Sequence, residues 1–221
     1  MAQKVNLSKT SKLDGIKSWS LQAVECCPGA LKELPAYIGE LVDACKGCYA
    51  TTNMYLMGPV KAPRIFNKED WKREDWVADM VFTLQKDKYF RWFDSGDSYS
   101  LKLAKKMLQV MEQTPNTQHW FPTRMMKFAK FAEIFAKMQA LPNVMVRFSS
   151  DSIVGEYTPG LHGSTILNTE EVPEGVVLCT AYQHEGKCNG CRACYNKDVA
   201  VIGYPAHGFK MKKVITLKLA A

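Results

Sequence analysis

The sequence lacks any long apolar run, since no stretch of its 221 residues approaches the roughly 18 consecutive apolar residues of a membrane-spanning helix. Its first residues, Met1 to Ser8, also lack the apolar segment of a secretory signal. Repeats and low-complexity tracts are absent too, and a hydrophobic content of 47% is typical of a folded globular protein. We therefore expect a single domain that stays in the cytoplasm and has no membrane partner.

Histidine is scarce, with four residues, whereas cysteine is abundant, with eight. Because the cytoplasm is reducing, these cysteines are poor material for disulfides and good material for metal ligands. A Cys-x-x-Cys turn lets two thiolates face one metal, and the chain has one such pair near its start and a run of three near its end. Seven cysteines are therefore candidate metal ligands: Cys27, Cys45, Cys48, Cys179, Cys188, Cys191 and Cys194.

The remaining cysteine and the histidines are weaker candidates. Cys26 is interpreted as a small buried hydrophobic residue or a spare thiol. The histidines are scattered, and only His184, four residues before Cys188, stands close in sequence to a cysteine motif.

Three interpretations of the cysteines remain open. Zinc would take four ligands, two from each motif, as a structural ribbon, but Cys179 and Cys194 would then have no role. A run of three cysteines at two-residue gaps also holds bacterial [4Fe–4S] clusters, with a remote cysteine as the fourth ligand. A redox dithiol is disfavoured because too many cysteines lie close together. We therefore expect one [4Fe–4S] cluster, or two, with zinc as the alternative cofactor.

The middle of the chain alternates strand-like and helix-like segments. Aromatic or apolar runs predict strands over 88–94, 117–121, 144–148 and 175–180, and apolar spacing predicts helices over 101–111 and 128–140. This alternation predicts an α/β protein with a parallel sheet and right-handed crossovers, here a partial β/α barrel. Residues 1–221 are taken as one domain, with the barrel core at 20–180 and a cysteine-rich segment with a basic tail at 179–221.

Each of the first three predicted strands ends in polar residues. In sheets and barrels built from such units, ligands bind outside the carboxyl ends of the strands. We therefore expect these residues around one ligand-binding mouth: Asp94, Ser95, Gly96, Asp97, Thr123, Arg124, Ser149, Ser150 and Asp151.

The net charge of +7 comes from the two ends of the chain. Residues 1–18 hold four lysines against one aspartate, and residues 206–221 hold four lysines and no acid, so the interior is formally neutral. These ends are interpreted as solubilising tails, with phosphate contacts as the alternative. A nucleic-acid partner is a weaker hypothesis, because the aromatic residues that would stack bases are expected in the core instead: Trp71, Trp76, Trp92, Trp120 and Phe121.

Several short motifs follow one another between residues 25 and 196: Cys27-Pro28-Gly29-Ala30, Cys45-x-x-Cys48-Tyr49-Ala50, Asp94-Ser95-Gly96-Asp97, Thr123-Arg124, Leu141-Pro142-Asn143-Val144, Ser150-Asp151 and the terminal Cys-x-x-Cys-x-x-Cys. In this order they resemble the bacteriophage gene product 88 family, which is itself similar to the radical S-adenosylmethionine (SAM) enzymes. The resemblance implies that the protein is located in the cytoplasm of a host cell. It also implies a partial β/α barrel with a [4Fe–4S] cluster at its top and SAM as a further ligand.

In radical SAM enzymes a Gly-Gly-Glu-like segment binds the SAM amino group, and Ser95-Gly96-Asp97 looks like its counterpart. The cofactor-binding residues that the resemblance implies, together with the strand ends, are Ser95, Gly96, Asp97, Thr123, Arg124, Ser150 and Asp151. The cysteine spacing departs from the radical SAM pattern, because Cys27 and Cys45 lie far apart in the sequence and no aromatic residue directly precedes Cys48.

Two functions therefore stay open, and the residues do not decide whether the protein is an enzyme. The first is an iron–sulfur protein with redox or SAM-related activity, acting on an unidentified small molecule or redox partner. The second is a non-catalytic protein in which iron–sulfur or zinc joins the C-terminal segment to the barrel.

Overall fold

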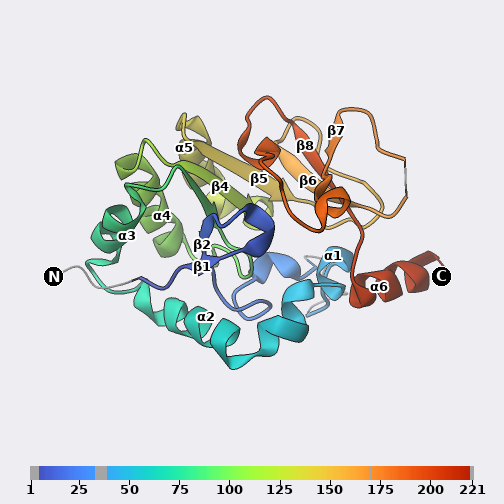
Figure 1. Ribbon diagram of the computed structural model, residues 1–221, viewed down its shortest axis with the longest axis horizontal. Helices are drawn as coiled ribbons and strands as arrows, with labels where there is room; N and C mark the ends of the chain where they lie inside the picture. The colour runs from blue at the N-terminus through green and yellow to red at the C-terminus, as the bar shows by residue number, and fades with distance from the viewer. Residues whose placement is uncertain (1–4, 33–38, 170, 220–221) are drawn as a thin grey trace.

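The computed structural model describes residues 5–32, 39–169 and 171–219 and is built around an eight-stranded sheet (Figure 1). The strand order is β1-β2-β3-β4-β5-β6-β8-β7, in which only β1 and β2 pair antiparallel. The α/β class and the parallel sheet are confirmed, and the sheet does not close. The strands are β1 (Ser8–Lys9), β2 (Lys17–Trp19), β3 (Tyr89–Trp92), β4 (Gln118–Thr123), β5 (Val144–Ser149), β6 (Gly163–Leu167), β7 (Val176–Leu178) and β8 (Val201–Pro205).

The connections between β2, β3, β4 and β5 contain α-helices, whereas the described residues between β5 and β8 contain none. Figure 1 shows α3, α4 and α5 together on one side of the sheet, and α6 beside α1. Within the described ranges, no helix is both long and apolar enough to cross a membrane. The helices are α1 (Asp43–Lys46), α2 (Gly58–Asp70), α3 (Trp76–Leu84), α4 (Leu101–Gln113), α5 (Ala132–Ala140) and α6 (Phe209–Leu219).

The two predicted helices differ in how well the pattern located them. Helix α4 starts where expected, because the Ser100 hydroxyl accepts a hydrogen bond from Leu103 N at 3.2 Å and caps the first turn. The second prediction, 128–140, was wrong at its start, since α5 begins at Ala132 after two short 3₁₀ turns. Phe128 between those turns has an extended backbone and packs against the core, which delays the helix.

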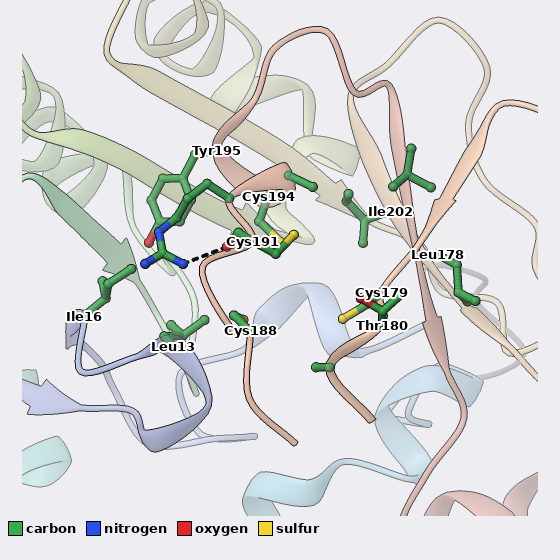
Figure 2. Close-up of a pocket in the computed structure, with 14 residues that line it drawn as sticks. Leu13, Ile16, Leu178, Cys179, Thr180, Cys188, Cys191, Cys194, Tyr195 and Ile202 are labelled. Atoms are coloured by element: carbon green, nitrogen blue, oxygen red, sulfur yellow. Dashed lines mark hydrogen bonds between the residues drawn. The ribbon is translucent and has the colours of Figure 1, made fainter. Parts of the chain in front are cut away.

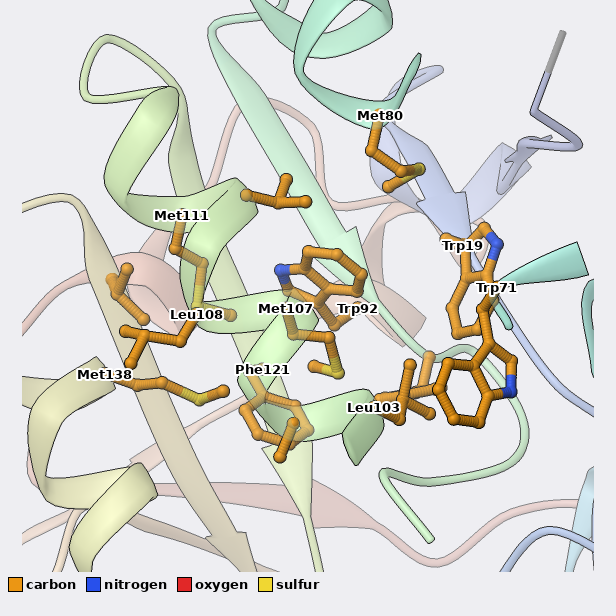
Figure 3. Close-up of a cluster of buried hydrophobic side chains, with 14 of the residues drawn as sticks. Trp19, Trp71, Met80, Trp92, Leu103, Met107, Leu108, Met111, Phe121 and Met138 are labelled. Carbon is orange, nitrogen blue, oxygen red and sulfur yellow. The ribbon is translucent and has the colours of Figure 1, made fainter. Parts of the chain in front are cut away.

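The main core lies between the sheet and its helices. It is rich in tryptophan and methionine, and Figure 3 shows Trp92 and Phe121 of the sheet among methionines of the helices. Trp19 packs edge-on against Trp76, with ring centroids 5.3 Å apart. The five aromatic residues considered as base-stacking candidates are all buried, and four of them belong to the main core: Trp71, Trp76, Trp92 and Phe121. The fifth, Trp120, is outside this core and lines a cavity at the ends of the strands.

The described parts of the two end segments, 5–18 and 206–219, pack against the rest of the fold and are not free tails. Strand β2 pairs with β3, and Lys17 in it forms an ion pair with Asp87 at 2.8 Å. At the other end, helix α6 packs beside α1, and Lys218 pairs with Asp43 at 2.6 Å. Strand β8 lies between β6 and β7, so the segment 179–221 contributes to the same sheet as the region 20–180.

Candidate functional site

The carboxyl ends of the parallel strands open onto a cavity of about 540 Å³. The ninth residue of the predicted mouth, Asp151, does not line this cavity. Its carboxylate instead accepts hydrogen bonds from Arg124 Nη1 at 3.0 Å and from Lys127 Nζ at 2.7 Å. The other eight residues of the predicted mouth line it: Asp94, Ser95, Gly96, Asp97, Thr123, Arg124, Ser149 and Ser150.

Asp97 uses its carboxylate to join the ends of β3 and β4. One oxygen accepts from Ser98 N and from the Thr123 hydroxyl, both at 2.7 Å, and the other accepts from Arg124 N at 2.8 Å. Burial raises the pKa of Asp97, whereas these three donors favour its charged form. Gly96 before it has φ +78°, and a Cβ there would lie 2.5 Å from Leu21 Cβ, so only glycine fits this turn.

Asp94 and Ser95 are held by an arginine from α2. Arg64 Nη2 lies 2.6 Å from Asp94 Oδ2, and both side chains are only 6% exposed. Arg64 Nε donates to Ser95 Oγ at 2.7 Å, and Tyr55 donates to Asp94 Oδ2 at 3.3 Å. These contacts place at the end of β3 a buried carboxylate whose charge is paired with that of Arg64.

The first cysteine group lines the same cavity. Cys27 lies on a loop that packs directly on the end of β4. The packing is close, since a Cβ on Gly29 would lie only 2.7 Å from Arg124 Cβ. Burial raises the pKa of the Cys27 thiol, and Asp97 adds to this effect. Cys45 and Cys48 contribute in the same direction, as expected for neighbouring thiols.

Helix α1 carries Cys45, and Cys48 follows it at the start of the next 3₁₀ turn. Ala44 N donates to Asp151 O at 3.1 Å, which places the helix beside the end of β5. Cys48 N then bonds to Cys45 O at 3.1 Å, so the Cys-x-x-Cys segment forms the tight turn that its spacing predicts. Burial raises the pKa of Cys45, and the Arg124 guanidinium opposes this.

The second group surrounds a smaller cavity of about 40 Å³, lined by all four cysteines of the C-terminal segment (Figure 2). Cys179 follows β7 and donates its N–H to Gly203 O at 2.8 Å, and Cys191 N bonds to Cys188 O at 2.9 Å. Burial raises the pKa of Cys188 to about 11. All of the group except Cys191 also line the larger cavity, so the two cysteine groups share it.

One buried arginine ties this cysteine-rich segment to the sheet. Arg147 of β5 is 0% exposed, and no carboxylate of the described residues pairs with it. Its guanidinium instead donates to five carbonyl oxygens at 2.8–3.5 Å. These acceptors belong to Gly163, Ala193, Cys194, Asn196 and Ala200.

The N-terminal turn before β2 holds the same segment from the other side. Lys12 O accepts a hydrogen bond from Cys188 N at 2.8 Å. Asp14 Oδ2 accepts from Gly190 N at 3.0 Å and from Arg192 Nη1 at 2.9 Å. Residues 188–192 are therefore fixed by backbone and side-chain contacts that do not involve the thiols.

The cavity residues that escaped the sequence reasoning include Arg91, Lys12 and Tyr204. A signal for Arg91 was present, because Phe90 and Trp92 face the core and strand alternation places Arg91 on the opposite face. Lys12 had been counted only as surface charge. Tyr204 lies on β8, a strand that was not predicted.

All eight cysteines are free thiols. Within residues 5–32, 39–169 and 171–219, no three side chains of Cys, His, Asp and Glu are grouped closely enough to hold one metal ion as they stand. His184 lines neither cavity.

The comparisons with known proteins bear on the family alone. No curated protein and no solved structure matches the chain. The family model described as gene product 88 matches residues 2–197, which is nearly the whole chain. The protein therefore belongs to the bacteriophage gene product 88 family, as the order of its motifs predicted.

Proposed function

We propose that this protein binds iron–sulfur clusters at the carboxyl edge of its sheet. The observation that carries the proposal is that six cysteines, from two groups far apart in the sequence, line one 540 Å³ cavity. The first group is Cys27, Cys45 and Cys48, and the second is Cys179, Cys188, Cys191 and Cys194. Cysteine thiolates are the ligands that [4Fe–4S] clusters require.

The number of cysteines in each group supports iron–sulfur over zinc. Four thiolates complete the coordination of a [4Fe–4S] cluster, so the second group has the ligands for a closed cluster. Three thiolates leave one iron without a protein ligand, so the first group has the ligands for a cluster that can bind a small molecule. A single structural zinc would use only four of these seven cysteines.

The open iron is the basis for a catalytic version of the proposal. It would face a cavity of about 540 Å³, within the size range of small-molecule sites, bordered by the polar ends of three strands. SAM is one candidate ligand, because Ser95-Gly96-Asp97 lies at the end of β3 on this cavity. The Asp97 carboxylate, however, is already used by Ser98, Thr123 and Arg124.

A second candidate function follows from the shared cavity. Cys179, Cys188 and Cys194 line it together with the first group, so one cluster with ligands from both groups is a specific alternative. Such a cluster would have no open iron and would join the C-terminal segment to the sheet. Its binding free energy would then add directly to the stability of the fold.

The experiment is a measurement of iron and acid-labile sulfide per chain on anaerobically purified protein. Two cubane clusters predict about eight irons per chain, since each holds about four. In that case Cys45→Ser and Cys194→Ser should each remove only part of the iron. Cys26→Ser is the matched control. Because Cys26 lies in the hydrophobic core, this variant should retain all of the iron.

Other iron counts separate the alternatives. About four irons, all lost in either variant, would support the single shared cluster. Stoichiometric zinc without sulfide would overturn the iron–sulfur proposal. SAM binding is tested separately: if SAM neither perturbs the EPR signal of the reduced cluster nor is cleaved to 5′-deoxyadenosine, the SAM-related version fails.

A further inference from the structure

We infer that the large cavity binds an anionic small molecule through Arg91 and Lys12, by a carboxylate or phosphate group. Both side chains line the cavity, together with cysteines of both groups. No carboxylate of the described residues lies within ion-pair distance of either one. The inference deepens the proposed function, because it names a ligand class for the same cavity.

The orientation of Arg91 is set by the protein. Its Nε donates to Phe93 O at 3.0 Å, and its guanidinium carbon lies 4.6 Å from the centroid of the Trp120 ring. Besides this stacking and the bond at Nε, Arg91 has a side-chain hydrogen bond with Tyr49, and the remaining guanidinium N–H groups are the donors available to a ligand. A guanidinium held in this way is well placed for two-point contact with a carboxylate or phosphate.

The groups around Arg91 do not neutralise its charge. Its electrostatic neighbours are the phenols of Tyr49, Tyr55 and Tyr204, together with Asp94. Burial raises the pKa of all three phenols, so they are uncharged at neutral pH. Asp94 is the only acid of the set, and its carboxylate is paired with Arg64 at 2.6 Å.

Lys12 is a second cation on the same cavity, and no carboxylate of the described residues pairs with it. Its ammonium lies 5.7 Å from the ring centroids of both Tyr182 and Tyr204. Its backbone is fixed, since its carbonyl accepts from Cys188 N at 2.8 Å. Tyr204 therefore lies close to both cations, Lys12 and Arg91. Its hydroxyl lies 3.3 Å from Cys194 Sγ.

A purely structural explanation is that the two cations balance the negative charge of the thiolates that would hold the clusters. Lys12 does act on Cys188, and Arg91 on Cys194. Arg147 already lies close to Cys194 and serves the segment without facing the large cavity. Cys188 and Cys194 also line the large cavity, so a ligand role is separated from charge balance by variants of Arg91 and Lys12 that lose anion affinity and keep their iron.

The test is calorimetric titration of the anaerobically purified full-length protein with inorganic phosphate and, separately, with succinate, at low ionic strength. Iron and sulfide are measured on the same samples. The two titrants separate a phosphate-bearing ligand from a carboxylate-bearing one. We expect saturable binding of at least one. Arg91→Gln and Lys12→Gln should each weaken it about tenfold, the loss of one charge-assisted hydrogen bond, with iron content unchanged.

Two further variants make the result decisive. Arg91→Lys keeps the charge and should retain more affinity than Arg91→Gln. Lys187→Gln removes an exposed lysine that does not line the cavity and should leave binding unchanged. Lys12→Gln keeps the test valid if Arg91→Gln fails to fold.

The inference is overturned if neither anion binds, if binding is insensitive to both glutamine variants, or if those variants lose iron in parallel with affinity. Anion binding by protein that contains no iron would leave the inference intact and contradict the proposed function. Full iron content without anion binding would support the proposed function and overturn the inference.

Discussion

Arg147 Nε donates a hydrogen bond to the carbonyl oxygen of Cys194 at 2.9 Å, so a buried strand residue holds the last cysteine by its backbone. The same guanidinium binds four further carbonyl oxygens of the surrounding chain. The path of the cysteine-rich segment across the sheet therefore depends on one side chain.

Replacing Arg147 with methionine should destabilise the protein by at least about 3 kcal/mol, because buried carbonyls lose charge-assisted hydrogen bonds. The free energy of unfolding by urea measures this. Lys187→Met is the control, since it removes an exposed cation from the same segment. An equal effect of the two substitutions would show that Arg147 is not the anchor.

Asp14 is expected to control the C-terminal cysteine group selectively. Asp14→Asn keeps a residue that tolerates the left-handed backbone at φ 54° but removes the charge that binds Arg192. We expect chelators to extract part of the iron about tenfold faster, as for other residues that orient metal ligands. Asp198→Asn, a change at an exposed position of the segment, should leave extraction unchanged. Uniform acceleration for all the iron would contradict the prediction.

The buried ion pair between Arg64 and Asp94 should be costly to break from one side. Arg64→Met leaves a carboxylate that is 6% exposed without its partner, and about 3–5 kcal/mol of stability should be lost. Adding Asp94→Asn to this variant should restore part of the loss. The exposed pair Glu133–Lys137 is the control, since Lys137→Met should change the unfolding free energy by no more than about 0.5 kcal/mol. Similar losses at the two pairs would disprove this role of burial.

His119 should make the fold sensitive to acid. Its Nδ1 accepts from Trp92 Nε1 at 3.3 Å, and its Nε2 lies 2.9 Å from the Thr114 hydroxyl, which donates to Val110 O. Both ring nitrogens are thus satisfied in the neutral form. Burial lowers the pKa of His119 from 6.5 to about 3.

The sign of this pH effect follows from proton uptake. Above pH 6.5 neither state binds the proton, so the contribution to stability is complete. As the pH falls from 6.5 towards 3, the unfolded chain takes up a proton that the folded chain excludes, and stability is lost. His119→Gln should show a shallower decline of unfolding free energy between pH 7 and 5, whereas His184→Gln, at an exposed position, should follow the unmodified protein. Identical slopes for all three proteins would refute the assignment.

Local patterns located the central elements and the cysteine turns. The spacing of Leu101, Ala104, Leu108 and Met111 predicts helix α4 because helical periodicity is a property of neighbouring residues. Cys45 and Cys48 form their predicted turn for the same reason. The polar residues after β3, β4 and β5 predicted the mouth, since parallel strands must end at one edge.

Strands β1, β2, β6 and β8 were not predicted, because their short segments carry weak signals of their own. Strand β2 has three residues, and β8 contains Gly203 and Pro205, which are uncommon within strands. Gly203 fits here because Leu167 and Val176 occupy the space that a side chain would need. Such segments become strands through pairing with neighbours from distant parts of the chain.

The amino-acid sequence by itself determined the family, the α/β class and the two cysteine groups, because motif order and periodicity are encoded over short distances. Only the tertiary structure decided that six cysteines of the two groups share one cavity and that Arg91 and Lys12 line it with no carboxylate of the described residues within ion-pair distance. The physical reason is that strand order and side-chain burial depend on long-range pairing. Spacing along the chain does not contain that information.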